Sequence, residues 1–216
     1  MELREQVEEI CRAAQQAARG MARVTTADKD RWLLRAAERL EAAKAPILEA
    51  NRRDMAEAEA KGVATPMVRR LSLEGGKWET MIDGLRQVAR LPDPVGEITD
   101  SVVRPNGLRV GRMRIPLGVI GMIYESRPNV TVDAAALCVK AGNTVVLRGG
   151  SEAFHSNQAL AAELRAAAAD TGLSEDVVRT FPTTDRAAVD HLLAMDRYLD
   201  LIIPVSYTHL TLPTKV

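Results

Sequence analysis

Two short polar segments of this sequence contain the residues best suited to chemistry. The first reads Tyr124-Glu125-Ser126-Arg127-Pro128-Asn129, and the second reads Arg148-Gly149-Gly150-Ser151-Glu152. Each segment follows a run of apolar residues and precedes a stretch with a helical pattern. Sheets built from alternating strands and helices bind their ligands at the carboxyl ends of the strands, which is where such segments lie. The two segments are therefore the first places to look for a site.

Asn129 has two interpretations that the single residue leaves open. Its side-chain amide can donate a hydrogen bond to an oxygen that gains negative charge in a transition state. Asparagine is also a frequent N-cap residue, so Asn129 can equally cap the helix that follows. The two interpretations are compatible.

The second segment has the composition of an anion-binding loop. Gly149 and Gly150 let the backbone approach a ligand closely, the helix N-terminus that follows favours negative charge, and Arg148 can pair with a phosphate. An ordinary strand-to-helix turn is the alternative, because the chain contains neither a GxGxxG nor a GxxxxGK[ST] pattern. These residues predict a nucleotide-sized anion site but no particular reaction.

The remaining reactive side chains carry no comparable signal. Cys11 and Cys138 each lie in an apolar helical pattern, which favours small buried hydrophobic residues over activated thiolates. Two isolated thiols form neither a disulfide framework nor a metal site. His155, His191 and His209 are scattered, so no metal site is predicted.

The elements that must position the two segments begin with a helical region. Apolar residues recur at steps of three and four and predict helices over about 3–20, 25–40, 46–60, 66–71 and 76–91. Thr25 followed by Asp28 is typical of a helix N-terminus. Pro46 suits the first turn of the third helix, and Gly62 ends it.

A β-hairpin is predicted next. Residues 97–103 and 108–115 read as two strands, joined through Asn106-Gly107, which is a strong hairpin signal. Apolar residues and arginines are mixed in the second strand, which favours an exposed ribbon such as an oligomerisation arm.

From Pro116 the pattern alternates between strand and helix. Strands are predicted at 117–123, 144–148, 177–181 and 198–203, and helices at 130–141, 152–170 and 185–195. The first strand is almost continuously apolar, as in a parallel sheet that is buried on both faces. The fold class is therefore α/β, with a doubly wound parallel sheet.

Bulk composition limits the partners. The chain has 216 residues, of which 46% are hydrophobic and 27% charged, and 29 basic residues balance 29 acidic ones. A chain without net charge has no general attraction for nucleic acid or anionic lipid, so neither is expected as a partner. No signal peptide or apolar run of about 20 residues is present, and a cytoplasmic location is expected.

The run PLGVIGMIYESRPNVTVD (116–133) resembles the signature segment of the glutamate-5-semialdehyde dehydrogenase (γ-glutamyl phosphate reductase) family, a branch of the aldehyde dehydrogenase superfamily. Further matching runs are LPDPVG (91–96), LCVKAGNTVVLRGGSE (137–152) and MDRYLDLIIP (195–204), so the similarity covers residues 1–204. The resemblance implies an aldehyde-dehydrogenase-like fold. It divides the chain into a helical region of the cofactor domain (1–91), an oligomerisation arm (92–115) and a partial Rossmann-like NADP-binding sheet (116–204).

The resemblance also implies a reaction. The family reduces L-glutamyl 5-phosphate with NADPH to glutamate 5-semialdehyde and phosphate, in proline biosynthesis. A cysteine thiolate attacks the acyl phosphate and expels phosphate, and hydride from NADPH then reduces the thioester. By resemblance, the full-length protein forms a homo-oligomer, and it is linked functionally to glutamate 5-kinase.

Site residues carry over from the family by position. Asn129 matches an asparagine that stabilises the oxyanion of the tetrahedral intermediate. Arg148 lies where the superfamily commonly has a lysine that contacts the adenosine ribose, and an arginine suits the 2′-phosphate of NADP. The cofactor-binding residues implied are Tyr124, Ser126, Arg148, Gly149, Gly150, Ser151 and Glu152. The glycine loop departs from the Pro-Ser-Glu that is usual in the superfamily.

Two departures from the family affect the expected activity. Members are about twice as long, and neither Cys11 nor Cys138 matches the catalytic cysteine, which leads us to expect an N-terminal half that lacks the catalytic domain and does not turn over substrate. Residues 205–216 read as a non-native tail, because the family has an arginine and a glycine-rich loop there. Two other interpretations stay open: a noncatalytic half-domain that binds nucleotide or pairs with a full-length subunit, and a general aldehyde dehydrogenase acting on free aldehydes.

Overall fold

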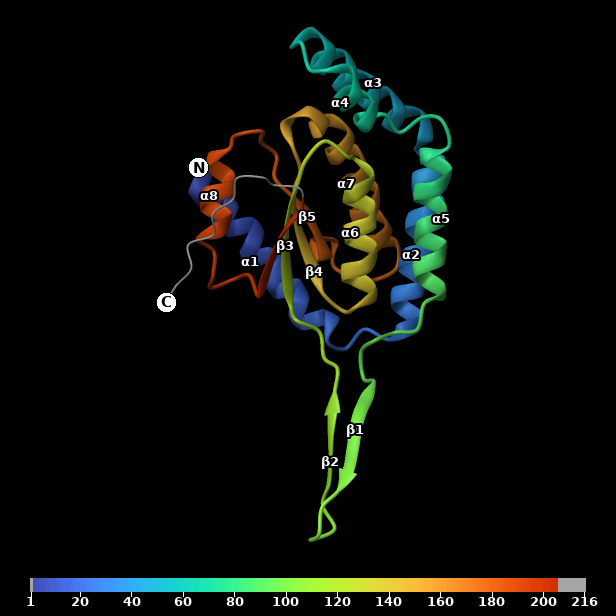
Figure 1. Ribbon diagram of the computed structural model, residues 1–216, viewed down its shortest axis with the longest axis vertical. Coiled ribbons are helices and arrows are strands. Elements are labelled where there is room, and N and C mark those ends of the chain that lie inside the picture. The colour runs from blue at the N-terminus through green and yellow to red at the C-terminus, as the bar shows by residue number, and fades with distance from the viewer. Residues whose placement is uncertain (1, 206–216) are drawn as a thin grey trace.

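A computed structural model of the chain describes residues 2–205 (Figure 1). Val205 is the last residue of the final strand. The rest of the expected tail, residues 206–216, lies outside the described residues, and so does His209.

The centre of the molecule is a four-stranded parallel sheet. Its strands are β3 (Val119–Tyr124), β4 (Thr144–Arg148), β5 (Val178–Thr180) and β6 (Leu201–Val205), in the spatial order β5-β4-β3-β6. Both β3 and β4 are buried almost throughout, because they carry apolar residues on both faces. The predicted doubly wound parallel sheet is confirmed. The strand order reverses between β3 and β6, so the crevice for a ligand is expected at the carboxyl ends of these two strands.

Helices cover both faces of the sheet (Figure 1). One face packs against α1 (Leu3–Met21) and α8 (Ala187–Leu193). The other packs against α6 (Asn129–Lys140) and α7 (Phe154–Asp170), and α2 (Thr26–Ala42) and α5 (Lys77–Arg90) form an outer layer on these two helices. Short 3-10 helices lie at Ser151–Ala153 and Glu175–Val177. Each face of the sheet has its own hydrophobic cluster, and the sheet separates them.

The outer layer is fixed by polar contacts as well as by apolar packing. The predicted start of α2 is confirmed, because Thr25 and Asp28 form a reciprocal capping box. One turn later, Lys29 forms a buried ion pair with Asp93, which lies just beyond α5. The hydroxyl of Thr26 also donates to Asp93, at 2.7 Å. These contacts join the start of α2 to the end of α5.

The hairpin of β1 (Ile98–Val103) and β2 (Arg109–Met113) extends away from the rest of the molecule (Figure 1). Its predicted turn is confirmed: Gly107 has φ of 83°, and the Arg104 N–H donates to the Leu108 carbonyl at 2.8 Å. Both strands are exposed along nearly their whole length. The hairpin therefore takes little part in the core.

At the opposite end lie α3 (Lys44–Ala60) and α4 (Thr65–Leu71), next to the carboxyl ends of the sheet strands (Figure 1). The buried carboxylate of Asp54 on α3 accepts hydrogen bonds from the N–H groups of His155 (3.0 Å) and Ser156 (2.7 Å). These two N–H groups belong to the first turn of α7, which is thereby fixed against α3.

Two predicted boundaries are wrong. The last strand starts at Leu201 and not at Tyr198, because Tyr198 and Leu199 both donate backbone hydrogen bonds to the Met195 carbonyl and so form a turn after α8. The helix predicted over 152–170 begins with the 3-10 turn at Ser151–Ala153, and α7 itself starts at Phe154.

Candidate active site

The two segments singled out in the sequence lie side by side at the carboxyl ends of β3 and β4. A methyl group built on Gly150 would lie 3.5 Å from both the Cα atom of Glu125 and the backbone nitrogen of Ser126. This is ordinary van der Waals distance, so the two loops are in contact. The parallel pairing of β3 with β4 brings them together across about 25 residues of sequence.

Tyr124 anchors the first loop from the inside. Its hydroxyl lies 2.7 Å from the hydroxyl of Thr131, which in turn donates to the side-chain oxygen of Asn157 at 2.9 Å. Because Thr131 has one proton to donate, Tyr124 is the donor in the first bond. Burial raises the pKa of the Tyr124 phenol above its ordinary value. The phenol is therefore neutral and bound inside the protein.

Close packing restricts the first glycine of the second loop more than the second, because the near contact at Gly150 is the mobile end of the Glu152 side chain. A Cβ atom at Gly149 would lie 2.2 Å from the side-chain nitrogen of Asn157, and one at Gly150 would lie 2.6 Å from a carboxylate oxygen of Glu152. The clash at position 149 is with a buried side chain, so larger residues are excluded there whether or not a ligand binds.

Arg148 is directed inward. The residue is 4% exposed, and its guanidinium donates to the carbonyl oxygens of Thr184 and Asp185, both at 3.1 Å, and to that of Gly149. It thus joins the glycine loop to the segment before α8. The space around Arg148 and the two glycines is a cavity of about 10 Å³, which holds at most one water molecule.

A more open cavity of about 100 Å³ lies where the strand order reverses. Ser126 is 7% exposed and lines it together with Tyr124 and with Val205 at the end of β6. Its other lining residues are Met67, Arg70, Glu125, Arg127 and Val130. Part of the first predicted segment thus lies at the crevice expected from the topology.

Asn129 is the first residue of α6, and the N-cap position belongs to Pro128. The capping interpretation of Asn129 is wrong, because its amide nitrogen donates to the carboxylate of Asp133 at 2.9 Å, one turn along the helix. An amide nitrogen has two protons, so this bond leaves a second N–H for another acceptor. Asp133 therefore orients the amide of Asn129.

Asn129 and Asp133 line a third cavity, which has a volume of about 630 Å³. We call it the cationic cavity, because four basic side chains and one carboxylate line it. The basic side chains come from α4, from the start of α5 and from the loop after β3: Arg69, Arg70, Lys77 and Arg127. The remaining lining residues are Gly75, Gly76, Thr80 and Met81.

The charge of Asp133 is not neutralised by these cations. Burial raises the pKa of its carboxyl group, and the hydrogen bond from Asn129 opposes this only in part. Within residues 2–205, none of the four basic side chains forms an ion pair, and Lys77 instead donates to the backbone carbonyl of Arg69 at 2.7 Å. The cationic cavity thus has an excess of positive charge beside the amide of Asn129.

Sequence reasoning missed the cationic side of this site. Only Arg127 and Asn129 lay in a segment that had been singled out, and Arg127 was given no role. A signal was present in Gly75-Gly76-Lys77, a glycine pair and a lysine at the start of α5, which is a pattern that suits an anion. The contribution of α4 had no such signal.

The two cysteines are unsuited to nucleophilic chemistry. Burial raises the pKa of the Cys11 thiol to about 12, with a further contribution from nearby Glu8, and burial alone raises that of Cys138 to about 12. The thiolate is the nucleophilic form, so neither residue is activated. In the part of the chain that the structure describes, no group of three or more His, Cys, Asp or Glu residues is arranged to hold a metal ion. No helix among residues 2–205 is long and apolar enough to cross a membrane.

The backbone of the site is suited to bind a dinucleotide, whereas the orientation of one side chain, Arg148, is less well suited. An α/β sheet binds such a ligand at a switch point, and this sheet has one. Beside it lie an accessible loop at Gly150 and Ser151 and the carboxylate of Glu152. The guanidinium of Arg148 is bound to backbone carbonyls and does not face the loop's outer surface. The predicted contact of Arg148 with a 2′-phosphate stays a prediction.

Comparison with known proteins identifies the class. Residues 2–203 match the sequence profile of the aldehyde dehydrogenase family. The chain belongs to this family, and its sheet and helices match the N-terminal portion of the family's α/β fold.

Two solved structures show which members of the family this chain is similar to. The γ-glutamyl phosphate reductase from Thermotoga maritima shares 40% identity over 94% of this chain, with a TM-score of 0.91. The γ-glutamyl phosphate reductase from Saccharomyces cerevisiae shares 32% identity over 91% of it, with a TM-score of 0.84. The chain covers 49% and 50% of these two proteins, so it spans about half their length. An engineered glycolyl-CoA reductase with bound NADP⁺ has the same fold at 20% identity, over 92% of this chain and 42% of its own, with a TM-score of 0.65.

Proposed function

We propose that this chain is the cofactor-binding part of an enzyme that reduces L-glutamyl 5-phosphate to glutamate 5-semialdehyde and phosphate, with NADPH as the reductant. The observation that supports this best is the 40% identity to the Thermotoga maritima γ-glutamyl phosphate reductase over 94% of the chain. The polar loop 124–129 supports it as well, because it lies at the switch point of the sheet beside a cavity rich in positive charge.

Asn129 is the residue proposed to take part directly in the chemistry. Its amide is oriented by Asp133 on the same helix, and it retains one N–H that is not bound to Asp133. A fixed donor of this kind stabilises an oxygen that becomes negative as an acyl carbon is attacked. The backbone of α6 holds the amide in place, so little reorganisation is needed during the reaction.

NADPH supplies the hydride when bound, and we propose that it lies across the carboxyl ends of the sheet strands. In this arrangement Tyr124 and Ser126 form the floor of the crevice, and the loop of Gly149, Gly150, Ser151 and Glu152 lies along its edge. Arg148 fixes this loop to the segment at Thr184 and Asp185. A direct contact of Arg148 with a 2′-phosphate would require release of these carbonyls.

We further propose that residues 1–216 do not turn over substrate alone. The reaction needs a nucleophilic thiolate, and the two cysteines present are buried with raised pKa values. A homo-oligomer, a link to glutamate 5-kinase and a cytoplasmic location remain predictions from the family resemblance. The noncatalytic half-domain remains the alternative.

A chimera tests the proposed function. Residues 2–203 would replace the matching half of the Thermotoga maritima protein, and NADPH formation from glutamate 5-semialdehyde, NADP⁺ and phosphate would be followed by absorbance. We expect activity that depends on phosphate. A chimera that is folded, binds NADPH and yet shows no phosphate-dependent activity would contradict the proposal, and activity without phosphate would favour a general aldehyde dehydrogenase.

Asn129→Ala in this chimera tests the oxyanion role. We expect kcat to fall by about 100-fold to 1000-fold, which is the usual cost of losing one such donor. Asn106→Ala in the hairpin turn is the matched control, because it removes an exposed amide far from the cavity. Equal kcat values for the two variants would rule out the role.

A further inference from the structure

Arg70 and Arg127 occupy a special place in the site, because each of them lines both cavities. One cavity is the crevice at the ends of β3 and β6, and the other is the cationic cavity that contains Asn129. Arg70 comes from α4 and Arg127 from the loop after β3, so the two come from separate parts of the chain. The two residues therefore lie at the junction of the crevice and the cationic cavity.

Both side chains are available to a ligand. Each residue is exposed, and within residues 2–205 neither guanidinium is engaged in an ion pair. The backbone of Arg127 is held in a tight turn by its N–H, which donates to the Glu125 carbonyl at 2.5 Å. The side chain of Arg127 is thus exposed, while its backbone is held in place.

We propose that Arg70 and Arg127 bind the phosphoryl group of the acyl phosphate and the phosphate ion that leaves it. The inference rests on the proposed function, which places the reacting carbon within reach of both the amide of Asn129 and the reductant in the crevice. The junction meets both conditions, and the phosphoryl group is bonded through one oxygen to that carbon. It must therefore lie at the same junction.

The chemistry of the two arginines fits a phosphoryl group. A guanidinium presents parallel N–H donors that match two phosphate oxygens, and it keeps its charge at any ordinary pH. Two guanidinium groups neutralise the two negative charges of an acyl phosphate or of the departing phosphate dianion. The rest of the 630 Å³ cavity, toward Lys77 and Asp133, leaves space for the amino-acid portion of the substrate.

Calorimetric titration of the 216-residue chain with inorganic phosphate at low ionic strength tests the proposal. We expect saturable binding, with affinity about tenfold or more weaker in Arg70→Gln and in Arg127→Gln, because each loses charge-assisted hydrogen bonds. The phosphate affinity of Arg127→Lys should lie between those of wild type and Arg127→Gln. Lysine keeps the positive charge but lacks the parallel N–H donors of the guanidinium. Acetyl phosphate, a small acyl phosphate, should compete with inorganic phosphate for the same site.

Arg104→Gln is the matched control, because it removes the same charge at the exposed tip of the hairpin. Binding in Arg70→Gln and Arg127→Gln that equals binding in Arg104→Gln would overturn the proposal, and so would absence of saturable binding to the folded wild-type chain. The titration involves no cofactor, cysteine or turnover. An inactive chimera with intact phosphate binding therefore counts against the proposed reaction alone, whereas an active chimera with no phosphate binding at these arginines counts against this inference alone.

Discussion

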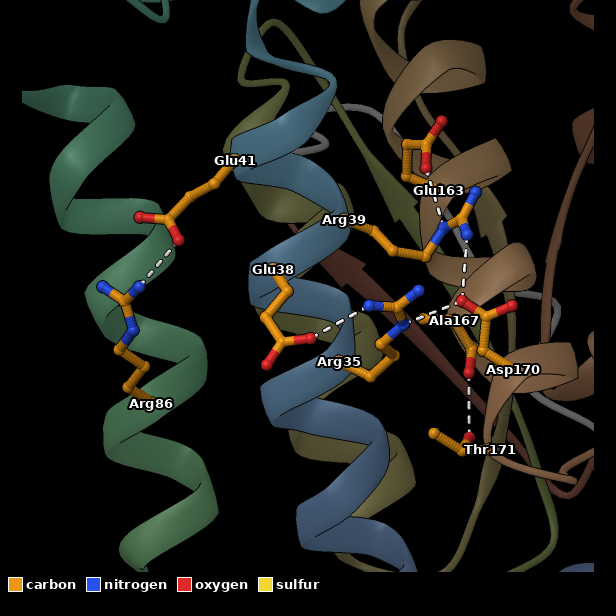
Figure 2. A network of polar contacts seen from close by, with 9 residues as sticks. All are labelled: Arg35, Glu38, Arg39, Glu41, Arg86, Glu163, Ala167, Asp170 and Thr171. Atoms are coloured by element: carbon orange, nitrogen blue, oxygen red, sulfur yellow. Dashed lines mark hydrogen bonds and ion pairs between the residues drawn. The ribbon is translucent and has the colours of Figure 1, made fainter.

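Charged side chains are arranged in opposite ways in the outer helical layer, including its contact with α7, and in the cationic cavity. Along α2 and α7, Arg35 and Arg39 both donate to the carboxylate of Asp170, at 2.8 and 2.9 Å, and Arg39 also donates to Glu163 at 2.9 Å (Figure 2). Further pairs on the same layer are Arg35 with Glu38 and Arg86 with Glu41. Here positive and negative charges are matched within the chain.

In the cationic cavity the charges are not matched. Arg69, Arg70, Lys77 and Arg127 line it, and the carboxylate of Asp133 is bonded to a neutral amide instead of to one of them. The pKa values of the carboxyl groups in the two regions are shifted in opposite directions accordingly. Hydrogen bonds from Arg35 and then Arg39 lower the pKa of Asp170, whereas burial raises the pKa of Asp133.

We infer from this difference that the paired charges of the outer layer stabilise the fold, whereas the unpaired cations of the cavity bind a ligand. Matched pairs favour the ionised form in the folded state and so contribute to stability. A partly buried carboxylate without a cation costs stability, and cations without counter-ions attract an anionic ligand. Loss of a matched charge in the outer layer should therefore lower stability and leave phosphate binding intact. Loss of an unpaired cation from the cationic cavity should instead weaken phosphate binding.

The largest effect is expected at the buried ion pair of the outer layer. Asp93→Ala leaves the ammonium of Lys29, which is 1% exposed, without its carboxylate and should lower the free energy of unfolding by about 3–5 kcal/mol. Urea unfolding measures the loss. Asp83→Ala, which breaks an exposed ion pair with Arg86 within α5, is the control and should have little effect.

The double variant Lys29→Met, Asp93→Ala sharpens this result. Removing both charges removes the unpaired ammonium, so most of the lost stability should return. Phosphate binding should be unchanged in every folded variant of this pair. A loss of phosphate binding in Asp93→Ala, measured on folded protein, would break the proposed separation between the two regions.

Much of the fold follows from local patterns in the sequence. Runs of apolar residues predicted β3 and β4, and the pair Asn106-Gly107 predicted the hairpin turn that the structure contains. These signals are local, because they depend on residue period and on backbone conformations that glycine favours. The start of β6 was misplaced, because the turn at Tyr198 and Leu199 is set by backbone bonds to Met195 that no side-chain pattern marks.

The site was predictable only where it lies on a single loop. The segment 124–129 could be found from its position after an apolar strand, and it does line both cavities. The contribution of α4 could not be found in this way. Arg70 and Arg127 line the same cavity only because α3 and α4 pack at the carboxyl ends of the strands. The inward direction of Arg148 likewise depends on the segment before α8, which is far away in the sequence.

Asp133→Asn tests the cavity side of the comparison and should raise stability at neutral pH. The folded pKa of Asp133 lies above its unfolded value of about 3.9, so the folded state binds more protons and stability falls as pH rises between the two values. An asparagine keeps the size and an acceptor oxygen for Asn129 without the partly buried charge. The midpoint of thermal unfolding at neutral pH and at acid pH measures the effect, which should disappear below the unfolded pKa.

A lower midpoint for Asp133→Asn at neutral pH would contradict this interpretation of the cavity. It would show that the carboxylate is stabilised by the surrounding cations after all. In the chimera, the same variant should lower kcat more than it raises KM, because it loosens the orientation of the Asn129 amide.

The smallest effect, and one of opposite sign, is expected for Asp170→Asn. The pKa of Asp170 is lowered by the arginines, so its contribution to stability is complete above the unfolded value of about 3.9 and is lost as pH falls through the folded value. The variant should therefore be slightly less stable than wild type at neutral pH and equal to it in strong acid. Added salt should reduce the difference, because Asp170 and its partners Arg35 and Arg39 are all partly exposed. The free energy of unfolding, measured across pH for wild type, Asp170→Asn and Asp133→Asn, should give two difference curves of opposite sign that meet at zero in acid; curves of the same sign would mean that the two regions do not differ in how they use charge.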